Sequence, residues 1–158
     1  MDGIKDVAYA IVNGITDNHQ ASVARMLKLM YLFDWSRVLN FGGAEPKYQW
    51  SCGMCGPSCE QILNTIMTDT QSFRTYYKDN RQGGEKLMVD CIDNDYSPQL
   101  SAQCAKAVSH VVRETKGNCW NDLVRLVSST MPVVLSSINS PLDLTKAAEI
   151  RRKALGKA

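Results

Sequence analysis

Three cysteines lie close together near the middle of the chain, and their spacing is the feature that most directly suggests chemistry. Cys52 and Cys55 are separated by two residues, and Cys59 follows four positions later. A short turn can bring the two sulfurs of a C-x-x-C pair onto one centre, where they chelate zinc or cycle between dithiol and disulfide. A small thiol- or metal-dependent enzyme built on Cys52, Cys55 and Cys59 is therefore one hypothesis for this protein.

The surrounding residues favour inert cysteines instead. Cys59 falls on the apolar face of an expected helix, where a thiol packs like a small hydrophobic side chain. No strand-then-helix context of the thioredoxin type precedes the pair. The remaining candidate ligands, which show no paired spacing, are Cys91, Cys119, His19 and His110. We predict no metal site, no cofactor and no catalytic residue, and no disulfide because the chain begins without a signal-peptide pattern.

Asp34 follows directly after the apolar run from Met26 to Phe33. An acid at the end of a buried helical run must lie at its rim or find a hydrogen-bond donor. A structural pairing with Arg37 or a backbone N–H is the favoured interpretation, and a polar contact to a partner is the alternative. His19 and His110 stand beside no carboxylate or thiol that would support acid–base catalysis, so we expect surface histidines.

Large aromatic side chains are more numerous than one small core requires, and Trp and Tyr are common in interface hot spots. Trp50 either seals a loop against the central helix or presents an anchor to a partner. Tyr76 and Tyr77 are adjacent on an expected strand, so their rings must point to opposite faces. Trp120 falls on a core face and needs no functional role. The partner-binding candidates are Tyr48, Trp50, Tyr76, Tyr77 and the basic Arg152.

Apolar periodicity places these residues on a series of short elements. The chain predicts helices over 4–12 and 21–40, a third helix with Pro57 at its first position, a fourth from Ser97 or Leu100, and a fifth after Gly117 that ends at Pro132. Strands over 73–77 and 86–91 flank a polar turn at 79–84, which indicates a hairpin. Neither Gly42-Gly43 nor Gly83-Gly84 has the context of a phosphate-binding loop.

Length and charge restrict the classes of protein. A chain of 158 residues is one domain by the usual length, and it carries 18 basic and 16 acidic residues, a net charge of +2. This small surplus makes nucleic acid an unexpected partner, and no apolar run is long enough to predict a membrane span. We expect a cytoplasmic, mainly α protein: a compact bundle of about five helices around a buried central helix, with room for a small β-hairpin. Residues 1–140 would form the domain, and 141–158 a basic C-terminal helix or tail.

Four features occur in a particular order: the KLMYLFDW helix over 28–35, the downstream Trp50, the Gly56-Pro57 pair, and the Leu100-Ser101 helix start. In this order and spacing the chain resembles the Panacea domain, also described as SocA-like, over about residues 4–132. That family contains antitoxins of bacterial and phage toxin–antitoxin pairs. The cysteines are a departure from the family pattern, in which the aromatic and the Gly-Pro pair are the recurring features.

The resemblance implies an antitoxin, not an enzyme, that neutralises a cognate bacterial or phage-encoded toxin by direct protein–protein binding. A variant within the family is the proteolytic adaptor, which delivers its toxin to a host protease. A DNA-binding autoregulator is a further class, but the chain shows no convincing helix-turn-helix. With the thiol or metal enzyme, these are the hypotheses that the sequence leaves open.

Overall fold

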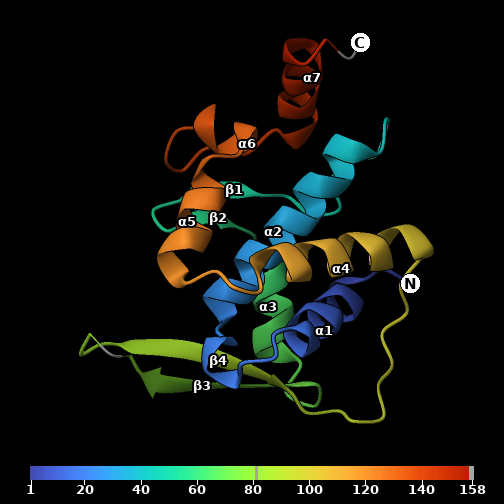
Figure 1. Cartoon of the computed structure of the whole chain (residues 1–158). Helices are drawn as coiled ribbons and strands as arrows, with labels where there is room; N and C mark the ends of the chain where they lie inside the picture. Colours follow the sequence, from blue (N-terminus) through green and yellow to red (C-terminus); the bar gives the residue numbers. More distant parts are fainter. Residues whose placement is uncertain (81, 157–158) are drawn as a thin grey trace.

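Helix α2 runs through the middle of the molecule, and the other elements pack around it (Figure 1). The computed structural model describes residues 1–80 and 82–156. Along this part of the chain the elements are α1 (Ile4–Gly14), the 3-10 helix η1 (Asn18–Gln20), α2 (Val23–Asn40), β1 (Ser51–Gly53), β2 (Gly56–Ser58), α3 (Glu60–Thr68), β3 (Phe73–Asp79), β4 (Glu85–Cys91), α4 (Ala102–Thr115), α5 (Trp120–Ser128), α6 (Met131–Val134) and α7 (Leu144–Ala154).

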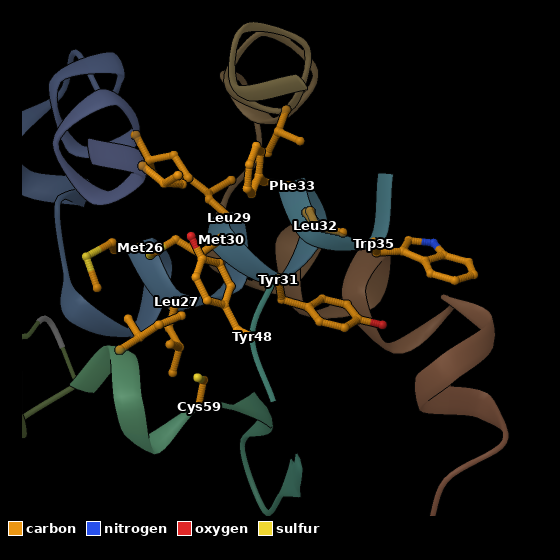
Figure 2. Close-up of a cluster of buried hydrophobic side chains, with 14 of the residues drawn as sticks. Met26, Leu27, Leu29, Met30, Tyr31, Leu32, Phe33, Trp35, Tyr48 and Cys59 are labelled. Carbon is orange, nitrogen blue, oxygen red and sulfur yellow. The ribbon is translucent and has the colours of Figure 1, made fainter. Parts of the chain in front are cut away.

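The expected central helix is confirmed, with its first turn two residues later than predicted. The Ser22 hydroxyl accepts a hydrogen bond from the Arg25 N–H at 3.0 Å and caps the start of α2. Fourteen of the eighteen residues of α2 are buried, so the helix has no solvent face. Figure 2 shows the α2 side chains pointing to several sides, with Tyr48 and Cys59 packed among them. Elements on all sides of α2 therefore share one core.

The segment after α2 folds into a short antiparallel hairpin that the sequence did not predict. Cys52 pairs with Pro57, and Gly53 pairs with Gly56, which has a φ of +105°. The prediction that Pro57 starts a helix is wrong, because the turn between β1 and β2 places it in a strand. Helix α3 begins at Glu60, after Cys59.

The predicted hairpin after α3 is confirmed and is longer than expected. Strands β3 and β4 pair from Phe73 opposite Cys91 to Asp79 opposite Glu85. The Val89 N–H donates to the Ala21 carbonyl at 3.0 Å, which ties the inner edge of the hairpin to the start of α2. The distal half of the hairpin extends away from the helices in Figure 1.

The prediction of a mainly α bundle of about five helices is wrong. The chain is 51% helical, with seven α-helices and two small two-stranded antiparallel sheets among the described residues, and is a mixed α/β structure. Turn residues explain much of the difference. The Gly53–Gly56 pair turns the first hairpin, and an expected single helix that ends at Pro132 is divided into α5 and α6, with Pro132 in the first turn of α6.

The C-terminal region attaches to the rest of the fold at two places. The Cys52 N–H donates to the Ser140 carbonyl at 2.8 Å, which joins residues before α7 to the edge of β1. Helix α7 buries an apolar stripe of Leu144, Ala147 and Ala148. None of the helices in the described part of the chain combines the length and the apolar character needed to cross a membrane.

Candidate functional site

Asp34 organises the loop that follows α2. Its carboxylate is fully buried and accepts hydrogen bonds from Arg37 Nη1 at 3.0 Å, from the backbone N–H groups of Lys47 and Tyr48 at 2.9 and 3.2 Å, and from Trp50 Nε1 at 3.0 Å. Four donors from two segments thus converge on one carboxylate. The structural interpretation of Asp34 is confirmed, and both expected types of partner are present.

This network places Tyr48 and Trp50 inside the protein. Tyr48 is 7% exposed and Trp50 is 3% exposed. The Trp50 ring packs edge-on against Tyr31, with the ring centroids 5.5 Å apart. Trp50 therefore seals the loop against α2, and neither side chain offers an anchor on the surface of this structure.

The other three partner-binding candidates lie in two further regions. Tyr76 and Tyr77 are on β3, where Tyr76 is half-buried beside the Arg74 guanidinium and Tyr77 is 68% exposed. Arg152 lies on α7 and donates to the carbonyls of Val38 and Leu39 at the end of α2, at 2.5 and 3.2 Å. The five candidates do not form one site, and Tyr77 is the one whose side chain is freely accessible.

The three clustered cysteines also have different environments. Cys52 and Cys59 are buried, whereas Cys55 is exposed at the turn between β1 and β2. Burial raises the pKa of the Cys59 thiol, which disfavours the thiolate needed for nucleophilic or metal chemistry. Among the described residues, no three or more His, Cys, Asp or Glu side chains are arranged to hold a metal ion.

A different region brings charged and aromatic side chains together. A pocket of about 760 Å³ lies between the start of α2, the start of α5, and the turn and first residues of β4 in the β3–β4 hairpin. We call it the cationic pocket. Its lining residues are Gln20, Ser22, Val23, Ala24, Arg25, Leu27, Leu63, Asn80, Gln82, Glu85, Lys86, Leu87, Cys119 and Trp120.

Trp120 marks one wall of the cationic pocket. The prediction that it belongs to the core is wrong, because 41% of the residue is exposed at the first position of α5. Leu123 and Val127, on the same helix, are fully buried and carry the packing. The Lys28 ammonium lies 5.2 Å from the centre of the Trp120 ring, a cation–π arrangement that fixes the indole beside the pocket.

Two buried cations stand at or behind this pocket. Arg25 is 5% exposed and Lys28 is 4% exposed. Arg25 Nη1 donates to the Asn118 carbonyl at 3.3 Å, and Lys28 Nζ donates to the Cys55 carbonyl at 2.6 Å. Neither makes an ion pair within the described part of the chain, in contrast to Arg37 with Asp34. Burial lowers the pKa of both groups, so the fold stabilises each charge less well than water does.

Arg25 and Lys28 were not singled out from the sequence as site residues, and Trp120 was assigned to the core. The sequence did allow Lys28 to be predicted as a buried cation, because a lysine inside the apolar run from Met26 to Phe33 has to be buried with its charge. Arg25 and Trp120 gave no comparable signal, because the pocket forms between elements that are about 95 residues apart in the chain. Such a site depends on tertiary packing and not on local spacing.

The arrangement suits recognition more than covalent chemistry. It joins apolar walls, an aromatic ring and cations that make no ion pair within the described residues, which are the elements of an anion-binding surface. No protein-family model matches the chain, and neither a curated protein nor a solved structure matches it.

Proposed function

We propose that this chain is a Panacea-like antitoxin that neutralises a cognate toxin by direct protein–protein contact. The order of the KLMYLFDW helix, Trp50, Gly56-Pro57 and the helix start at Leu100-Ser101 supports the proposal. In this view α2 and its surrounding helices are a scaffold, and the exposed strands and loops determine which toxin is bound.

The observation that carries the proposal is the β3–β4 hairpin. Its inner strand, β4, is tied to the start of α2, whereas no other strand of the described residues pairs with the outer edge of β3. An open strand edge is a template for pairing with another chain. Tyr77 stands on this same strand with 68% of its surface exposed, and an exposed tyrosine is a frequent interface anchor.

Co-expression with the product of the neighbouring open reading frame tests the proposal. We expect the neighbour alone to arrest growth, and this chain to restore growth and copurify in a stoichiometric complex. A harmless neighbour that does not copurify would contradict the proposal. Disappearance of the toxin from cells without a stable complex would contradict neutralisation by binding and indicate delivery to a protease.

A pair of variants locates the contact. Tyr77→Ala should weaken the complex at least about tenfold, the effect of losing a moderate interface anchor. Leu155→Ala is the matched control, because Leu155 is also well exposed, at 58%, but lies after α7. Equal loss in both variants would show that the hairpin has no special part in binding.

A further inference from the structure

The cations at the cationic pocket make no ion pair within the described residues. Burial lowers the pKa of Arg25, and the negative charge of Asp17 opposes this shift without pairing with Arg25. Three cations at or next to the pocket each donate to a backbone carbonyl: Arg25 to Asn118, Lys28 to Cys55, and Lys86 to His19. A carbonyl satisfies a hydrogen-bond donor but does not neutralise its charge. Glu85 is the one carboxylate among the lining residues, and it is exposed at the end of β4. The pocket region therefore carries an excess of positive charge.

Arg25 has hydrogen-bond donors that the described residues do not use. Its side chain makes a single hydrogen bond within the described residues, through Nη1. The side-chain atoms that are both enclosed and unpaired include none from Arg25. The remaining guanidinium N–H groups of Arg25 thus reach solvent, and Arg25 lines the pocket although 95% of the residue is covered. A buried guanidinium with free donors is arranged to take a planar or tetrahedral anion.

The start of helix α2 adds positive electrostatic potential to the pocket. Ser22, Val23 and Ala24 at its start line the pocket. The Ser22 cap takes the N–H of Arg25, and no acceptor is found among the described residues for the N–H groups of Val23 and Ala24. The start of a helix of 18 residues carries partial positive charge and free N–H donors, both of which favour an anion.

The rest of the lining is suited to a flat, partly apolar group. Leu27 of α2, Leu63 of α3 and Leu87 of β4 form apolar walls, and the Trp120 ring stands at the rim. Indole rings stack on nucleobases and other flat rings. The volume of about 760 Å³ lies in the range of small-molecule sites.

From these observations we infer that the cationic pocket binds a small anionic ligand that carries a flat ring, of the nucleoside phosphate class. The phosphate lies against Arg25 and the start of α2, and the ring lies against Trp120 and the leucine walls. This site is separate from the open edge of β3, and its occupancy does not depend on whether the chain neutralises a toxin.

The test is isothermal titration calorimetry of the full chain with the ribonucleoside 5′-monophosphates and 5′-triphosphates of adenine, guanine, cytosine and uracil. We expect saturable binding of at least one nucleotide with a Kd below about 1 mM. The corresponding nucleoside and inorganic phosphate should each bind at least about tenfold more weakly, because each makes only half of the contacts. The indole N–H resonance of Trp120, assigned with Trp120→Phe, should shift during the titration.

Variants with opposite expected signs locate the ligand. Arg25→Gln and Trp120→Leu should each weaken binding at least about tenfold, and Glu85→Gln should strengthen it because a carboxylate is removed from the lining. Arg113→Gln is the matched control, since the Arg113 side chain is 72% exposed on α4. If Arg25→Gln does not fold by circular dichroism, the exposed positions Trp120 and Glu85 still decide the matter.

Two results would overturn the inference. One is the absence of saturable binding by every nucleotide at about 5 mM, which is about five times the highest Kd that we expect. The other is binding that is unchanged by Trp120→Leu and Glu85→Gln. Because these titrations need no toxin, their failure is distinguishable from failure of the proposed antitoxin function.

Discussion

Replacement of Asp34 by Asn keeps the size of the side chain but removes its charge and one acceptor oxygen. The carboxylate serves four donors: Arg37 Nη1, the N–H groups of Lys47 and Tyr48, and Trp50 Nε1. One amide oxygen accommodates about two of them, and the new NH2 group faces the others. Two donors without an acceptor cost about 1–3 kcal/mol each, and Arg37 is left as a buried charge without its partner. We expect Asp34→Asn to lower the free energy of unfolding by about 3–5 kcal/mol.

Urea unfolding followed by far-UV circular dichroism measures this loss. A domain of ordinary stability unfolds with about 5–15 kcal/mol, so the variant should remain folded in water with a clearly lower urea midpoint. Asp79→Asn is the control, because Asp79 is exposed at the end of β3, and it should change stability by less than about 0.5 kcal/mol. A loss below about 1 kcal/mol for Asp34→Asn would refute the view that this carboxylate holds the loop against α2.

Three further predictions concern stability. Burial alone would raise the pKa of Asp6, but hydrogen bonds, led by that from the Gln99 N–H, lower it below the ordinary 3.8. The resulting stabilisation is complete above pH 3.8 and is lost as the pH falls through the folded-state pKa, so Asp6→Asn should flatten the acid-induced fall in the urea midpoint. Burial lowers the pKa of Lys28 below 10.5, so its charge opposes folding most at low pH. The stability of Lys28→Met relative to the natural chain should therefore fall as the pH rises through the folded-state pKa of Lys28 toward 10.5, and an increase would contradict the assigned cause. Gly56→Ala should cost about 1–3 kcal/mol in thermal or urea unfolding, because φ is +105° and the new Cβ would lie 3.1 Å from Lys28 Nζ, whereas Gly42→Ala meets no atom within 4 Å and should cost less than Gly56→Ala.

The pattern of apolar and polar residues along the sequence was sufficient to predict the elements that depend mainly on neighbouring residues. The unbroken apolar run from Met26 to Phe33 predicted a helix buried on all sides, and α2 is that helix. Two strand-like segments around a polar turn that contains glycine predicted the β3–β4 hairpin. Asp34 was expected to find buried donors, because a carboxylate next to an apolar run has few other stable solutions.

The errors come from competition between local and tertiary preferences. Proline is compatible both with the first position of a helix and with a strand. Pro57 lies in a strand here because it pairs with Cys52 in the β1–β2 hairpin. Trp120 shares its spacing with Leu123 and Val127, but as the first residue of a short helix it remains at the rim of the core. The cationic pocket could not be predicted, because three separate elements have to meet before Arg25 and Trp120 line one space.

Hydrogen–deuterium exchange of the chain, alone and mixed with the product of the neighbouring open reading frame, tests the proposed antitoxin function most directly. We expect a stable complex in which amides of β3, over Phe73–Asp79, gain protection at the open strand edge. We also expect little change in α2, which is already buried. Absence of a stable complex, or a complex whose protection leaves the hairpin unchanged, would contradict neutralisation through the β3–β4 hairpin.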